Sequence, residues 1–270
     1  MCSSLKTDYK KPLTNFLQPK QLNMNKLLCL LLCAATVSAF GQGKTLYRVN
    51  VLKPKQGMRS AFEASWKAHV AKFHTTADKR LVYEITSGPS AGSYIIVEGP
   101  VSYADMDIEK PMSKEHGLDM ERTFSSLIEP NSTNGIYRNA DTLSYHGDTK
   151  ADLFLLSTTV LKDGKTPEYL TEMRRNVLLY TKQNLPISIN YFVKQLAGNK
   201  PTMVSVRILK NGYKEMDSDY FKMAPDWFKN AYIADYGQAA WDARQKIVVD
   251  DVESREQAFE KLRTDLSSPQ

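Results

Sequence analysis

The feature that most constrains this 270-residue chain is an internal repeat with an offset of about 110 residues. Residues 103–107 (Tyr-Ala-Asp-Met-Asp) match residues 213–217 (Tyr-Lys-Glu-Met-Asp) and follow a predicted strand in each copy. Each copy opens with a β-branched strand, a short turn that contains Gly57 or Gly164, and a helix. The repeat indicates that one α/β folding unit is present twice.

Both copies predict the order strand, helix, strand, strand, helix, strand. In the first copy we expect strands at 46–53, 81–86, 94–98 and 137–144, and helices at 58–73 and 116–128. In the second copy we expect strands at 153–162, 189–194, 203–208 and 260–267, and helices at 169–180 and 226–247. The last strand has an alternative, because residues 256–262 also show helical spacing.

This order is the split βαβ, or ferredoxin-like, pattern. Both helices of such a unit pack on one face of its sheet, so the other apolar face needs a covering layer. Two copies in one chain can place sheet against sheet. We therefore expect an α+β fold of two tandem ferredoxin-like (βαββαβ) repeats, residues 44–147 and 151–268, that form one pseudo-dimeric α/β barrel rather than two independent domains.

Residues 1–39 have the composition of a removable leader. Residues 24–26 (Met-Asn-Lys) are a short basic segment, residues 27–37 are apolar but too short to span a bilayer, and Ala39 ends a typical signal-peptidase site. We expect a signal peptide that starts at Met24 and is cut after Ala39, or slightly later before Gln42. Residues 1–23 are then a start-site artefact or a disordered extension. The mature chain is expected to be exported, periplasmic or secreted, with no membrane span.

The leader accounts for most of the net charge and for all the cysteines. It holds five of the 36 basic and one of the 30 acidic residues, which leaves 31 basic and 29 acidic residues in the mature chain. This near balance argues against a nucleic-acid partner, which requires excess Lys and Arg on one face. Cys2, Cys29 and Cys33 all precede residue 40, so the mature protein has no disulfide, thiolate nucleophile or cysteine metal ligand.

In element order and strand-helix patterning, residues 45–268 resemble the dimeric α/β-barrel superfamily, which includes antibiotic-biosynthesis monooxygenases, NIPSNAP-like proteins and stress-responsive barrel proteins. One chain would here supply both halves, as a monomer or in a homo-oligomer. The resemblance is to a fold and carries no catalytic signature.

Three functional hypotheses follow from this resemblance. The first is a protein that binds a small apolar or aromatic ligand between the sheets. The second is a monooxygenase that is cofactor-independent, as implied by the antibiotic-biosynthesis group, or related to haem. The third is a non-catalytic interaction protein with a packed barrel. A cavity of a few hundred Å³ would favour ligand binding, and a packed interior the interaction protein.

Two residues invite comparison with the haem-degrading monooxygenases of this superfamily, which use an asparagine on the first strand, a tryptophan on the third and a histidine on the second helix. Asn50 and His116 match two of these positions, but the third strand has no tryptophan. We therefore expect no cofactor, with haem as the alternative. His69, near Trp66 on the first helix, is either a pocket or haem contact or a core histidine bonded to the backbone.

Charged residues also interrupt apolar strands. Glu84 and Lys194 hold equivalent positions on the second strands, and Arg207 lies on a third strand. If these residues point between the sheets, they orient a polar ligand or act as acid and base. If they lie at exposed strand edges, their charges discourage pairing with the edge of another sheet. A shift of one residue in strand register moves every side chain to the opposite face, so the register decides between these two roles. The candidate ligand-binding residues are thus Asn50, Trp66, His69, Glu84, His116, Lys194 and Arg207.

The histidine spacing predicts no metal site. The four histidines form no ligand motif, and none lies in the second copy. His69 and His74 are five residues apart, so they would not share one face of a continuous helix.

Expression of the full chain in a bacterial host is expected to give a mature protein that begins at Phe40, or at Gln42 for the later cut. N-terminal sequencing and intact mass measure this. Ala39→Asp is expected to block or shift the cut, because signal peptidase requires small residues there, whereas Asn15→Asp is expected to leave it unchanged. A purified protein that retains residues 27–37 would contradict the leader.

Overall fold

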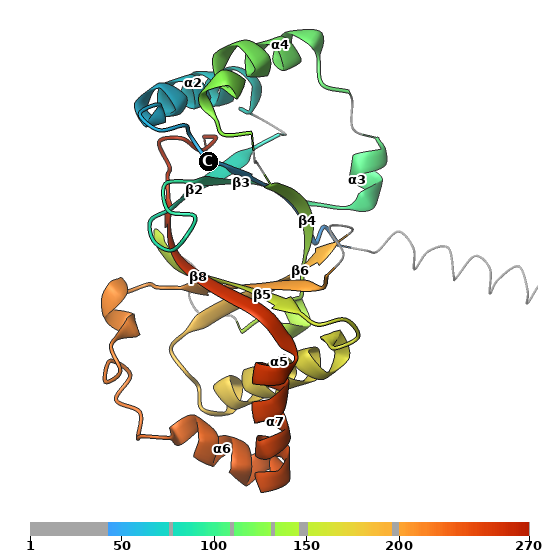
Figure 1. Cartoon of the computed structure of the whole chain (residues 1–270), viewed down its shortest axis with the longest axis vertical. Helices are drawn as coiled ribbons and strands as arrows, with labels where there is room; N and C mark the ends of the chain where they lie inside the picture. Colours follow the sequence, from blue (N-terminus) through green and yellow to red (C-terminus); the bar gives the residue numbers. More distant parts are fainter. Residues whose placement is uncertain are drawn as a thin grey trace, which may run out of the picture. The chain divides into compact units, whose positions relative to one another are not determined.

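Strands from both predicted copies join in one closed antiparallel barrel, in the order β1-β3-β2-β8-β5-β7-β6-β4 (Figure 1). The computed structural model describes residues 43–75, 78–108, 111–130, 133–145, 151–195 and 200–269. The predicted leader lies outside these residues, as does His146. The strands are β1 Leu46–Leu52, β2 Arg80–Ile85, β3 Tyr94–Val101, β4 Thr133–Asn139, β5 Leu153–Leu161, β6 Ser188–Gln195, β7 Thr202–Ile208 and β8 Val252–Leu262.

The barrel confirms the predicted α+β class. Within the described residues, six helices accompany the strands: α2 Arg59–Phe73, α3 Tyr103–Asp107, α4 Lys114–Thr123, α5 Thr166–Lys182, α6 Trp227–Tyr236 and α7 Gln238–Asp250. In Figure 1, α2 and α4 cover one side of the ring, and α5 to α7 lie on the opposite side. Among the described helices, none has the length and apolar character needed to cross a bilayer.

The strand order is the same in each half of the barrel. The first half runs β4-β1-β3-β2 and the second runs β8-β5-β7-β6, so the first and third strands of each half are central. Two pairings close the ring. At one seam β2 pairs with β8, with Tyr83 opposite Leu262, and at the other β4 pairs with β6, with Tyr137 opposite Lys194.

The alternation of each strand divides its side chains between the barrel interior and the helices. On β1, Tyr47, Val49 and Val51 face the interior, whereas Leu52 packs beneath α2. The two hydrophobic cores therefore lie outside the ring, one under each helix layer. The first comprises Leu52, Phe62, Trp66, Val70, Val82, Tyr94, Ile96, Phe124 and Leu266. The second comprises Leu143, Leu161, Tyr169, Met173, Tyr191 and Met203.

The final strand differs from the prediction. β8 covers Val252–Leu262 rather than 260–267, and residues 256–262 are strand rather than helix. The sequence pattern failed because residues 253–257 of β8 are polar and exposed, which hides the alternation expected of a strand. The predicted helix at 226–247 is likewise two helices, because the chain turns at Gly237, whose φ of 85° suits glycine.

After β8 the chain crosses onto the first half. The Arg263 amide donates to the Val82 carbonyl at 2.8 Å, and the Trp66 indole donates to the Leu266 carbonyl at 3.0 Å. Leu266 is only 2% exposed, within the first core. The end of the second half therefore completes the core of the first.

Trp66→Ala is expected to lower the free energy of unfolding by about 3–5 kcal/mol, because it empties a buried ring site and leaves the Leu266 carbonyl without its donor. Urea unfolding followed by circular dichroism measures this. Trp227→Ala, at the half-buried start of α6, is the matched control and is expected to cost less. If both variants lowered the free energy of unfolding equally, the result would contradict the anchoring of the C-terminal segment by Trp66.

Candidate functional site

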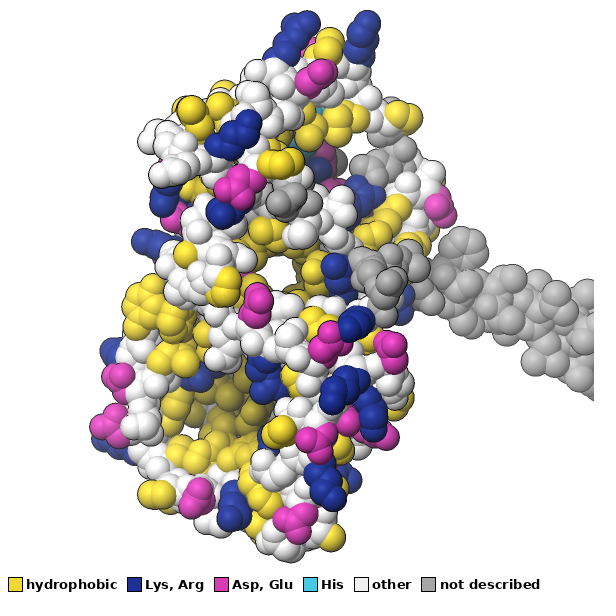
Figure 2. Space-filling view, in the orientation of Figure 1, with side chains coloured by type: hydrophobic (Ala, Val, Ile, Leu, Met, Phe, Trp, Pro, Cys, Tyr) yellow, Lys and Arg dark blue, Asp and Glu magenta, His cyan; other side chains and the backbone are white. Residues whose placement is uncertain are grey.

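The barrel encloses a cavity of about 780 Å³. Figure 2 shows the opening in the centre of the ring, with hydrophobic side chains around it. Every strand contributes to the lining, which is mainly apolar because the inward positions of the strands are mostly Val, Ile, Leu and Phe. The apolar lining includes Val49, Val51, Leu81, Ile85, Ile95, Val97, Phe154, Leu156, Phe192, Val204, Val206, Ile208 and Leu262.

One buried carboxyl group interrupts this apolar lining, whereas the carboxyl groups of Asp152 and Glu256 in the lining are exposed. Glu260 of β8 lies between Ile85 of β2 and Phe154 of β5, and it is 4% exposed. Its Oε1 has no hydrogen-bond partner among the described residues. Burial raises the pKa of Glu260 to about 8, because the charged form has lost its water. A carboxyl group with a pKa near neutrality can hold or remove a proton from a bound molecule.

Tyr83 lies on the same wall as Glu260. Its ring meets Phe154 edge-on, with centroids 5.4 Å apart. Burial, with a smaller effect from Glu260, raises the pKa of Tyr83 to about 12, so its hydroxyl stays protonated and can donate. Sequence reasoning missed Glu260. A signal was present, because Ala258 and Leu262 flank it at two-residue spacing, but the inward face became visible only once the register of β8 was known.

Two charged candidates face away from the cavity. Glu84 lies on the outer face of β2, where its carboxylate is 2.8 Å from Arg59 Nη2 and 2.8 Å from Arg263 Nη1. Arg207, on the outer face of β7, donates to the Glu215 carbonyl at 3.1 Å. Ion pairs and hydrogen bonds on the helix side thus occupy both residues.

The remaining strand and helix candidates are also placed outside the apolar lining. Asn50 is exposed on β1, opposite Ile96 and Asn134. Trp66 is part of the first core. Lys194 lies on the same face of β6 as Phe192, with its ammonium 6.0 Å from the centroid of the Tyr137 ring.

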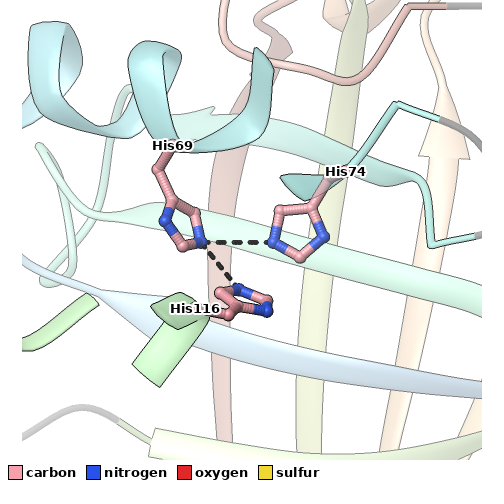
Figure 3. Close-up of side chains that lie close together, drawn as sticks. All are labelled: His69, His74 and His116. Atoms are coloured by element: carbon pink, nitrogen blue, oxygen red, sulfur yellow. Dashed lines mark hydrogen bonds between the residues drawn. The ribbon is translucent and has the colours of Figure 1, made fainter. Parts of the chain in front are cut away.

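His69 and His116 do come together, and His74 joins them outside the barrel (Figure 3). His69 Nε2 is 3.3 Å from His74 Nε2 and 3.1 Å from His116 Nε2. The spacing argument against this cluster was wrong, because it assumed a continuous helix. α2 ends at Phe73, and His74 leaves the helix with φ −124° and ψ 44°, which lets its ring face that of His69.

Carboxylates and a helix cap fix these rings. His69 Nδ1 bonds Asp119 at 2.8 Å, so its partner is a carboxylate rather than the expected backbone group. His74 Nδ1 bonds the Asp78 carboxylate at 3.0 Å. Ser113 caps α4 by accepting from the His116 amide at 3.1 Å, which positions His116 in the first turn. Burial lowers the pKa of His69 and of His116.

These residues do not fit haem. A haem iron needs an open nitrogen and a flat space beside it. The His116 ring stacks on Phe73 with centroids 4.4 Å apart, and its Nε2 faces His69. The described part of β3 also contains no tryptophan.

No family model matches the chain, and no curated protein matches it. Solved structures do. An anthrone oxidase-like protein aligns with 82% of this chain and 92% of its own, at 11% identity and a TM-score of 0.54. A candidate monooxygenase from Fusobacterium nucleatum subsp. nucleatum aligns with 80% of this chain and 91% of its own, at 14% identity and a TM-score of 0.50. At these identities the likeness shows the fold alone.

The free energy of unfolding is expected to fall as the pH rises from 4.5 to about 8, because folding raises the pKa of Glu260 from 4.5 to about 8 and the folded state then binds more protons than the unfolded state. Urea unfolding at a series of pH values measures the slope. Glu260→Gln is expected to remove this contribution, and Glu256→Gln, an exposed residue of the same strand and lining, to keep it. An unchanged slope in Glu260→Gln would contradict a neutral buried carboxyl.

Proposed function

We propose that this protein binds a small apolar or aromatic molecule inside the barrel, with Glu260 at its polar end. The observation that carries the proposal is the apolar cavity of about 780 Å³ with one buried carboxyl that lacks a hydrogen-bond partner on Oε1. Ligand pockets of about 300–1,000 Å³ typically combine apolar walls with a few polar groups that set orientation. The interaction-protein hypothesis requires a packed interior, whereas the lining residues surround a cavity.

The ligand is expected to present to Glu260 either a hydroxyl group or an acidic C–H bond that is activated by a carbonyl. Neutral Glu260 can donate a hydrogen bond to an oxygen, and ionised Glu260 can accept one. Asn190 and Thr158 also line the cavity and add neutral polar contacts. The apolar wall supplies affinity at about 25 cal/mol per Å² of buried apolar surface.

The enzymatic form of this proposal is a cofactor-independent oxygenase, supported at the level of fold by the anthrone oxidase-like and monooxygenase structures. Ionised Glu260 removes a proton from a CH₂ group that is conjugated with a ketone through aromatic rings. The resulting electron-rich anion reacts with O₂. One oxygen atom becomes a new carbonyl and the other leaves as water with both hydrogens of the CH₂ group. The substrate supplies all four electrons, so no further reductant is required.

We also propose that the chain is a duplicated ferredoxin-like unit that is exported after removal of residues 1–39. The common strand order supports duplication. So do Gly57 and Gly164, which precede α2 and α5 with φ of 77° and 76°. A short helix follows the third strand in each half, at Tyr103–Asp107 and Tyr213–Met216.

Isothermal titration with 1-naphthol and with naphthalene tests the binding proposal. Val206→Trp, which fills the cavity, is expected to weaken both ligands at least about tenfold, a loss near 1.4 kcal/mol. Glu260→Gln is expected to weaken 1-naphthol more than naphthalene, because only 1-naphthol has a hydroxyl, and Glu256→Gln to change neither. Unaltered affinity in Val206→Trp would place binding outside the barrel.

Oxygen uptake with anthrone tests the enzymatic form. One O₂ is expected to be consumed per quinone formed, and Glu260→Gln is expected to lower the rate at least about a hundredfold, the usual contribution of a general base. Binding of anthrone without oxygen uptake would contradict the oxygenase and leave a binding protein.

A further inference from the structure

The three-histidine cluster, His69, His74 and His116, belongs to neither the cavity nor the proposed reaction. It lies on the helix side of the first half of the barrel, where α2 ends and α4 begins (Figure 3). His69 and His74 are 2% and 3% exposed, and His116 is half-buried. One nitrogen of each ring lies within 4.8 Å of one nitrogen of both others.

The protons on these rings follow from their carboxylate partners. An ionised carboxylate only accepts hydrogen bonds. His69 Nδ1 bonds Asp119 at 2.8 Å and His74 Nδ1 bonds Asp78 at 3.0 Å, so each Nδ1 carries a hydrogen. In the neutral rings both Nε2 atoms then present lone pairs, and these two atoms lie 3.3 Å apart. Two lone pairs repel at that distance unless a cation or a proton lies between them.

We propose that the Nε2 atoms of His69, His74 and His116 bind one divalent metal ion of the zinc class, with water at a fourth position. Zinc–nitrogen bonds of about 2.0–2.1 Å in a tetrahedral site place the nitrogens about 3.3 Å apart. The observed Nε2–Nε2 distances from His69 are 3.3 Å to His74 and 3.1 Å to His116. Two of the three Nε2 pairs therefore have the required spacing, and the ligating nitrogens of all three rings lie within 4.8 Å of one another.

The surroundings match those of metal-bound histidines. A ligating imidazole commonly gives its other N–H to a carboxylate, which fixes the ring and increases its basicity. Asp119 does this for His69 and Asp78 does it for His74. The two carboxylates also supply negative charge near the cation. Three protein nitrogens with an open fourth position are the usual set of a zinc site that keeps an exchangeable ligand.

In the second half, a contact between α5 and α6 holds a different network of polar groups. There Glu172 of α5 is 1% exposed, and it accepts from Tyr232 at 2.6 Å and from Arg175 at 2.6 Å. A permanent cation, the Arg175 guanidinium, thus balances the buried acid. In the first half Arg80 pairs with Asp78 and Lys72 lies 3.7 Å from Asp119, and three imidazole rings converge beside these pairs as nitrogen ligands.

Titration of the untagged full chain with Zn²⁺ against a chromogenic chelator tests the site. One equivalent is expected to bind. His116→Ala, which removes the half-buried ligand and so disturbs packing least, is expected to weaken binding at least a hundredfold. Asp119→Asn, which leaves all three ligands, is expected to weaken it about 10–100-fold. His146→Ala removes the fourth histidine of the chain and is expected to leave affinity unchanged.

Thermal unfolding gives a second readout. Because Zn²⁺ binds the folded state, saturating Zn²⁺ is expected to raise the Tm of the wild-type protein and to leave the Tm of folded His116→Ala unchanged. No Zn²⁺ uptake by the wild type would overturn the proposal and indicate a proton shared between His69 and His74. Equal uptake by wild type and His116→Ala would also overturn it, because the ion would then bind elsewhere.

Discussion

The pairing of strands across the two halves is the constraint on which the rest of the structure depends. β2 bonds β8 at one seam and β4 bonds β6 at the other, so the edge strands of each half find partners in the opposite half. These pairings remove the free edges that an isolated sheet would expose. They also set the register that turns Glu260 inward, opposite Ile85, and leave Lys261 on the outer face.

The location of the hydrophobic cores explains how the barrel keeps a cavity. Two cores, one under each helix layer, bury the large side chains, and Trp66 and Leu266 tie the chain's end into the first. The interior therefore does not have to provide most of the stability. The free-energy cost of the barrel interior lies mainly in the buried carboxyl of Glu260. Burial favours the neutral form of this acid and raises its pKa. Strain of this kind is common where a protein binds or transforms a small molecule.

The two halves of the barrel differ in the contacts between their helices. In the second half a buried acid, Glu172, is neutralised by Arg175 within the chain. In the first half three imidazoles converge, and Asp119 and Asp78 orient two of them. The cavity is shared by both halves, whereas this cluster belongs to one. The two halves of the barrel therefore share one cavity but differ in the polar groups that lie between their helices.

The sequence by itself determined the α+β class and the order of most elements, because β-branched alternation and helical stripes are local patterns. It failed at β8, where exposed polar residues conceal the alternation. It assigned seven candidate residues, of which the structure brings His69 and His116 into contact. Only the tertiary structure decided that Glu260 faces the cavity, because one residue of register reverses every side chain of a strand. Only the tertiary structure also decided that His74 belongs to the cluster. The end of α2 turns the His74 ring toward His69, and the sequence spacing does not reveal this turn.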